Sequence, residues 1–106
     1  MAVDAILKEL ARVDYSNKFT KKIEEIYREK SKYSLCAYKK IDKLLMDKLD
    51  IIKMFPKAYA QVKHKYNLRK IPLDNYIILY SVQNNNVFIE DIIHQKSKKF
   101  NNQEKD

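Results

Sequence analysis

The sequence predicts an α+β domain built from an N-terminal strand, an antiparallel helical hairpin and a three-stranded antiparallel meander. Three features support this prediction: two apolar stripes with helical spacing, three short apolar runs separated by Asp- and Asn-rich turns, and a proline between the two regions. The chain has 106 residues, of which 45% are hydrophobic, and this suffices for one hydrophobic core but not for two. We therefore expect a single domain over residues 1–106.

The first strand is expected to end near Val13–Tyr15. Before it, residues 1–10 form an arm that fits either a short helix or a partly exposed strand, and both readings stay open. Ser16 follows, and a serine oxygen can accept a hydrogen bond from a free backbone N–H at the start of a helix. We expect the first helix to begin directly after it.

Two helices are predicted at about residues 17–30 and 35–55, joined by a short polar connection at 31–34. Pro56 ends the second helix, because proline disfavours helical backbone in the residue before it and donates no hydrogen bond. So short a connection implies an antiparallel hairpin. The expected stripes are Phe19, Ile23, Ile26 and Tyr27 in the first helix, and Leu35, Tyr38, Ile41 or Asp42, Leu45, Leu49, Ile52 and Phe55 in the second, which Leu44 and Met46 widen.

Three strands are predicted at about residues 67–73, 76–82 and 87–93. The chain contains no glycine, so the turns between them must use the Asp-Asn and Asn-Asn-Asn runs, whose residues tolerate positive φ best. Residues 76–82 carry apolar side chains on both faces, which predicts the central strand of the sheet. Pro72 cannot donate to a neighbouring strand and is expected at a sheet edge or a strand end. The polar residues 97–106 are expected to form a flexible tail.

The charge of the chain favours an anionic partner. There are 22 Lys and Arg residues against 14 Asp and Glu, which gives a formal net charge of +8. Nucleic acid, an acidic protein and an anionic membrane surface all fit such an excess. The alternative is a lysine-rich, solvated surface that reflects an A+T-rich coding bias, because Lys, Asn, Ile and Tyr are all abundant.

The composition also excludes several functional classes. Without glycine the chain cannot contain Gly-rich phosphate loops, dinucleotide-binding fingerprints or nucleophile elbows. Cys36 is the single cysteine, so an intrachain disulfide and a cysteine-rich zinc site are excluded, and Cys36 is expected to be a small buried hydrophobic residue. No apolar run is long enough to span a bilayer or to form a signal peptide. We expect a cytoplasmic protein with no metal, no cofactor and no membrane partner.

Several segments match a known pattern of residue types and spacings. They are V-D-Y-S-N-K-F at 13–19, F-P at 55–56, Y-N-L-R-K-I-P-L at 66–73, D-N-Y-I-I-L-Y-S-V at 74–82 and N-V-F-I-E-D-I-I-H at 86–94. With the order of the predicted elements, they resemble the RelE/ParE superfamily of type II toxin–antitoxin toxins. The resemblance covers about residues 12–99, and R-K-I-P-L-D-N-Y-I-I-L-Y is its most specific piece.

This resemblance implies a compact toxin that a cognate antitoxin holds inactive. Members of the RelE branch cleave messenger RNA on the ribosome, whereas members of the ParE branch inhibit DNA gyrase. We expect cleavage of mRNA on the ribosome by a metal-independent endoribonuclease reaction. The alternatives are gyrase inhibition without catalysis, a degenerate member that mainly binds its antitoxin and, outside the family, a basic nucleic-acid-binding module.

RNA cleavage by attack of the 2′-hydroxyl needs a base, an acid and cations that stabilise the charge on the phosphorane. The expected catalytic residues are Arg69, which matches the arginine of the family's Y-x-x-R-K segment, and His94, which matches a histidine at the end of the last strand. Arg69 suits a bidentate phosphate contact, and His94 suits proton transfer near neutral pH. Because side chains alternate along a strand, His94 is expected on the same face as Phe88, Glu90 and Ile92. The alternative for Arg69 is a surface or salt-bridged arginine, and the alternative for His94 is a hydrogen-bonded structural histidine.

Further cations near the sheet are expected to bind RNA phosphates: Lys63, His64, Lys65, Lys96 and Lys98. His64 also fits a solvated loop residue. Here the chain departs from the family, since Q-K-S-K at 95–98 replaces an Arg-rich element and Asp91 stands where an arginine is common. Lysine cannot reproduce the planar fork of arginine, so these departures argue against strong RNase activity.

Overall fold

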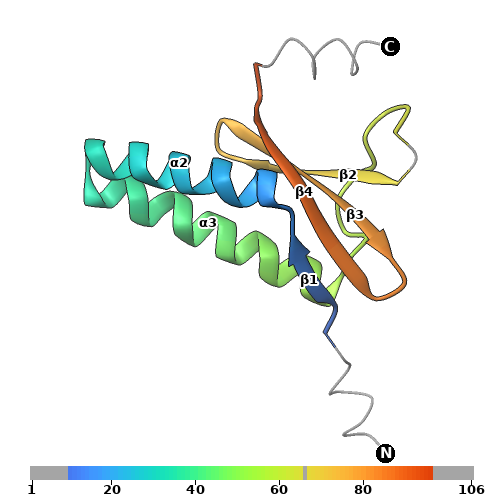
Figure 1. Ribbon diagram of the computed structural model, residues 1–106. Coiled ribbons are helices and arrows are strands. Elements are labelled where there is room, and N and C mark those ends of the chain that lie inside the picture. The colour runs from blue at the N-terminus through green and yellow to red at the C-terminus, as the bar shows by residue number, and fades with distance from the viewer. Residues whose placement is uncertain (1–9, 66, 97–106) are drawn as a thin grey trace, which may run out of the picture.

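The computed structural model describes residues 10–65 and 67–96, and Figure 1 shows how their elements are arranged. The α+β class is confirmed, and each boundary of the meander strands lies within one residue of its prediction. The expected tail at 97–106 and the expected arm at 1–10, except Leu10, lie outside the described residues. The elements are β1 (Arg12–Tyr15), α2 (Asn17–Tyr33), α3 (Leu35–Met54), β2 (Leu68–Leu73), β3 (Tyr76–Gln83) and β4 (Asn86–His94).

In this part of the chain the strands form one four-stranded sheet with the order β1-β4-β3-β2. Strands β2, β3 and β4 form the predicted antiparallel meander, and β1 lies parallel to β4 at the other edge. Strand β3 has a neighbour on each side, as its apolar residues predicted, and Pro72 lies in the edge strand β2. The meander therefore carries the two expected catalytic residues, Arg69 and His94, and β1 extends the sheet without contributing either of them.

Two backbone features of the meander follow from the absence of glycine and from an irregular register. Asp74 has φ 57° and Asn84 has φ 56°, so both tight turns use the left-handed conformation that Asp and Asn tolerate. The register between β3 and β4 shifts between Leu79 and Tyr80, which leaves Glu90 as an extra residue in β4. From Asp91 onward, each side chain of β4 therefore lies on the face opposite to the one that strict alternation from Asn86 would give it.

Helix α2 begins where Ser16 predicts. The Oγ atom of Ser16 accepts a hydrogen bond of 2.9 Å from the N–H of Phe19 and donates one of 2.6 Å to the carbonyl oxygen of Glu90, which joins the helix start to β4. The predicted connection at 31–34 is wrong except for Ser34, because α2 continues to Tyr33. No glycine or proline interrupts this segment, so the helix extends until Ser34 ends α2 and caps α3.

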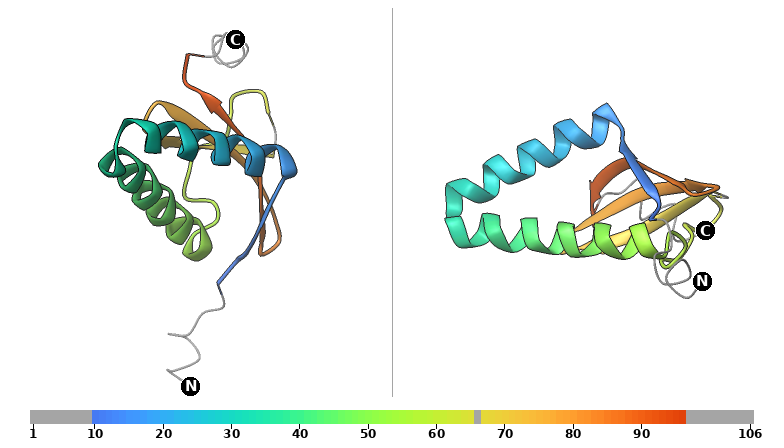
Figure 2. Two further views of the ribbon diagram at one scale, coloured as in Figure 1. Left: turned by 60° about the vertical axis from the view of Figure 1, so that its left-hand side comes forward. Right: turned by 90° about the horizontal axis from the view of Figure 1, so that it is seen from below.

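The hairpin packs against one face of the sheet, and its closed end projects beyond the sheet (Figure 2). Cys36 and Leu35 lie at that end and are exposed, so the prediction of a buried Cys36 is wrong. Met46 and Phe55 are also exposed, which narrows the predicted stripe of α3. Neither helix has the length and apolar character of a membrane span. The core contains Phe19, Ile23, Ile26, Ile41, Leu45, Leu49, Ile52, Ile71, Leu73, Ile78, Tyr80, Val87, Ile89 and Ile92.

Candidate functional site

Arg69 and His94, the two expected catalytic residues, lie on the same face of the sheet but at opposite corners. Arg69 is opposite Tyr80 in the ladder between β2 and β3, and His94 is opposite Tyr76 in the ladder between β3 and β4. Opposed residues of an antiparallel pair share a face, as do Tyr76 and Tyr80 along β3. Strand spacings then separate the Cα atoms of Arg69 and His94 by roughly 16 Å. The ladder row of Ile71, Ile78 and Ile92 lies between them and is buried under the hairpin, so the two side chains do not face a common site on this surface.

The guanidinium group of Arg69 contacts the loop between α3 and β2. Its Nη1 atom donates a hydrogen bond of 2.6 Å to the carbonyl oxygen of Tyr59 and lies 3.4 Å from the carbonyl oxygen of Lys57. The backbone of Arg69 also forms an isolated antiparallel bridge with Gln61. Arg69 therefore joins this loop to the open edge of β2, and its charge faces backbone carbonyl groups of its own chain.

His94 is exposed at the end of β4. Its ring packs edge-on against the ring of Tyr76, with 5.4 Å between the centroids and 78° between the planes. The Nδ1 atom accepts a hydrogen bond of 3.2 Å from the backbone N–H of Lys96, which fixes the orientation of the imidazole. No described carboxylate forms an ion pair with this ring that would hold it as a proton-transfer dyad.

The bulge at Glu90 changes the residues that accompany His94. The expectation that His94 shares a face with Phe88, Glu90 and Ile92 is correct for Ile92 alone, which lies on the face that the helices cover. Phe88 lies on the opposite face and is 41% exposed. The expectation failed because strict alternation holds only while each residue of β4 has its own partner in β3.

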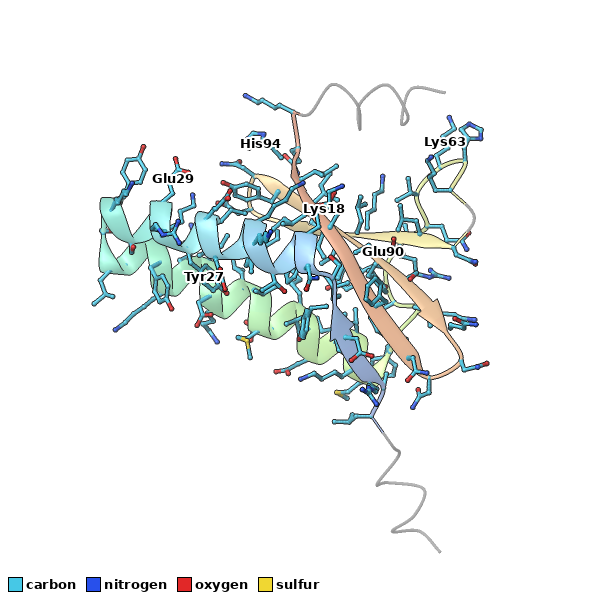
Figure 3. The ribbon with its side chains drawn as sticks, viewed as in Figure 1. Lys18, Tyr27, Glu29, Lys63, Glu90 and His94 are labelled. Carbon is cyan, nitrogen blue, oxygen red and sulfur yellow. The ribbon has the colours of Figure 1, made fainter. Side chains whose placement is uncertain are left out.

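The residues expected to bind phosphates fall into two separate groups. The first group occupies an exposed loop before β2, where His64 has φ 64°. Figure 3 shows Lys63 on this loop and His94 at the end of β4, on different parts of the molecule. Lys96 is exposed beside His94, whereas Lys98 lies outside the described residues. The first group consists of Lys63, His64 and Lys65.

Asp91, at the position where an arginine is common in the family, forms ion pairs with helix α2. Its carboxylate lies 2.8 Å from the Nζ atom of Lys22 and 3.6 Å from that of Lys18, and its side chain is 16% exposed. Its Oδ1 atom also accepts a hydrogen bond from the N–H of Ile92. An acidic residue at this position therefore binds β4 to the hairpin.

A groove that the sequence did not reveal lies between α2 and the end of the sheet. It has a volume of about 460 Å³, and its lining includes Glu25, Glu29, Tyr76 and His94. Burial, then the charges of Glu29 and Asp74, raise the pKa of Tyr76. The sequence signal was a pair of glutamates one helical turn apart on the polar side of α2. Among the described residues no three His, Cys, Asp or Glu side chains gather as metal ligands.

A helical hairpin on one face of a β1-β4-β3-β2 sheet is the fold of the RelE/ParE superfamily. Within that superfamily the chain belongs to the ParE family: the model described as the ParE toxin of the type II toxin–antitoxin system parDE matches residues 13–98. A similar solved structure is the chromosomal ParDE toxin–antitoxin system from P. aeruginosa, with a TM-score of 0.56, 14% identity, and coverage of 82% of this chain and 98% of that chain. No curated protein sequence matches this chain.

Proposed function

We propose that this type II toxin arrests growth by binding DNA gyrase, without catalysis, and that a cognate antitoxin neutralises it. The ParE family match supports this choice, because the ParE branch of the superfamily is the one that inhibits gyrase. Cleavage of ribosome-bound mRNA, which the sequence alone favoured, becomes the alternative. Gyrase binding is also supported by the separation of Arg69 and His94, the two side chains that RNA cleavage would need.

General acid–base cleavage of RNA requires its proton donor, its proton acceptor and its stabilising cation around a single phosphodiester. Arg69 and His94 lie at opposite corners of the sheet, roughly 16 Å apart by strand spacing. Arg69 would have to leave the carbonyl oxygen of Tyr59 before it could bind a phosphate. The buried row of Ile71, Ile78 and Ile92 separates the two residues on the face that the hairpin covers, which argues against their acting on one phosphate.

The distribution of arginine also supports a binding function. Arginine binds phosphate through a planar fork that lysine lacks, and clusters of arginine are suited to a dianionic transition state. The arginines of this chain are Arg12, Arg28 and Arg69. Arg12 and Arg69 lie in β1 and β2, the opposite edges of the sheet, and Arg28 lies in α2, so the three do not converge on one site. The other cations are lysines, which attract an anionic surface without organising a phosphorane.

The test uses the purified full chain in two parallel assays. In the first, the protein is added to DNA gyrase and relaxed plasmid, and we expect inhibition of supercoiling. In the second, it is added to ribosomes programmed with a defined mRNA, and we expect intact transcripts. Cleaved transcripts with unimpaired supercoiling would support the alternative. His94→Ala serves as the matched variant, because a binding toxin should behave as the wild type does in both assays.

A further inference from the structure

The groove between α2 and the end of the sheet, to which the proposed gyrase binding assigns no role, combines apolar and charged side chains. Its floor includes Ile26 and Ile92, which are 9% and 2% exposed, and the aromatic rings of Tyr76 and His94 form one wall. A volume of about 460 Å³ is sufficient for one long side chain together with its apolar neighbour. The floor and the aromatic wall favour an occupant with an aliphatic or apolar segment.

The opposite wall of the groove carries negative charge. Glu25 and Glu29 are exposed on α2, and neither forms an ion pair with a described residue. Lys22 also lines the groove, but its Nζ atom lies 2.8 Å from the carboxylate of Asp91, so the groove lining holds two carboxylates without an ion pair against one lysine that has one. The groove is therefore locally acidic on a chain with a formal net charge of +8.

A second hollow continues the groove along α2. It has a volume of about 350 Å³ and shares Glu25 and Glu29 with the first, while Arg28, Lys32 and Tyr33 complete its lining. Neither cation of this hollow forms an ion pair with the two carboxylates among the described contacts. The carboxylates stand at the junction of the two hollows, where a partner chain that follows α2 would pass both of them.

We propose that this groove binds a lysine or arginine side chain of the antitoxin. The aliphatic stem lies on the floor and against Tyr76 and His94, and the charged end lies between Glu25 and Glu29. Long basic side chains combine an apolar stem with a cationic tip, which matches a groove with an apolar floor and an acidic rim. This inference rests on the part of the proposed function that gives the toxin a cognate antitoxin. It does not depend on gyrase being the target.

Charge complementarity selects this occupant. An antitoxin that covers a toxin of net charge +8 is expected to be acidic overall, so a basic anchor gives a contact that fixes the register of the two chains. An acidic anchor in the same groove would meet two unpaired carboxylates, Glu25 and Glu29. An apolar anchor would fill the floor but would leave both carboxylates partly desolvated without a partner.

The test measures the dissociation constant of the full-length toxin and the antitoxin encoded beside it. Glu29→Lys should weaken binding by about tenfold or more, because it puts a like charge beside the basic anchor. Glu29→Gln should weaken binding less. Glu24→Lys is the matched control, since Glu24 is exposed on α2 outside the groove and its substitution should leave the constant unchanged. Reversing the charge of the anchor in the antitoxin should restore binding to Glu29→Lys.

Four results would overturn the proposal: wild-type affinity in Glu29→Lys, equal weakening by Glu24→Lys, tighter binding by Glu29→Lys, and loss of toxicity with unchanged antitoxin affinity. The third would mean that the groove takes an acidic side chain of the antitoxin, and the fourth would assign the groove to the target. Thermal unfolding of each variant shows whether the fold is intact. The assay measures antitoxin binding alone, so a negative gyrase assay leaves its result valid.

Discussion

The guanidinium group of Arg69 donates a hydrogen bond of 2.6 Å to the carbonyl oxygen of Tyr59, across the space between the edge strand β2 and the loop that follows α3. The same arginine lies opposite the fully buried Tyr80, whose hydroxyl donates to the carbonyl oxygen of Pro56 in that loop. Two adjacent side chains of the sheet thus hold one loop through its backbone. The arginine expected to bind a phosphate contributes to the fold at this position.

Replacing Arg69 should therefore lower stability. Arg69→Ala leaves the carbonyl oxygen of Tyr59 without its charged donor, and we expect the free energy of unfolding to fall by about 1.5 to 3 kcal/mol. Arg69→Lys should restore part of this loss. Urea unfolding measures both, with Arg12→Ala as the control, because the Arg12 side chain is 76% exposed in a surface ion pair. An Arg69→Ala protein of wild-type stability that has lost all toxicity would instead indicate a direct functional role.

His94 should be replaceable by another aromatic residue. His94→Phe keeps the edge-on contact with Tyr76 and removes any proton transfer, so growth arrest should stay within about twofold of the wild type. Dose–response curves of growth against inducer measure this. If His94→Phe abolished arrest in a folded protein whereas Tyr76→Phe did not, an acid–base role for the imidazole would follow.

The ion pair between Asp91 and Lys22 should make a measurable contribution to the free energy of unfolding because it is partly buried. Asp91→Asn should lower the free energy of unfolding by about 1 kcal/mol, and Asp91→Arg by more, since the new cation would lie beside Lys22 and Lys18. The double variant Asp91→Arg with Lys22→Glu should recover part of the loss. Asp47→Asn is the control, because its pair with Lys43 is exposed on one helix. Equal effects of Asp91→Asn and Asp47→Asn would contradict this account.

Stability should fall at alkaline pH. Burial, then the hydrogen bond that the Tyr27 hydroxyl donates to Asp42, raise the pKa of Tyr27 above its ordinary value of 10.0. Above about pH 10 the unfolded chain loses the tyrosine proton while the folded chain keeps it, so the stability present at neutral pH decreases as the pH rises. Urea midpoints between about pH 8 and pH 11 should decline less steeply in Tyr27→Phe. Tyr33→Phe, at an 80% exposed position, should keep the wild-type slope.

The elements of the fold that sequence predicted best are those with local causes. The start of α2 depends on one hydroxyl, that of Ser16, and the end of α3 on Pro56. The turns at Asp74 and Asn84 depend on the conformational tolerance of single residues. Each of these signals acts within a few residues of the chain, so the sequence contains it completely.

The features that sequence could not predict depend on residues far apart in the chain. The extra residue Glu90 becomes apparent only when β4 is aligned with β3, and it puts His94 and Phe88, which were expected to share a face, on opposite faces. The partner of Arg69 is a loop carbonyl group that carries no side-chain signal. Free cysteine is usually buried, which predicted Cys36 in the core, yet that end of the hairpin extends beyond the sheet (Figure 2).

The most direct test of toxicity without RNA cleavage is a comparison of plasmid supercoiling and transcript ends in the same culture after induction of the wild-type chain. We predict relaxed plasmid and the transcript 5′ ends of uninduced cells, and the same pattern in a strain that expresses His94→Phe. New transcript ends at codon-spaced positions in the wild type, absent from the His94→Phe strain and accompanied by normally supercoiled plasmid, would contradict the account.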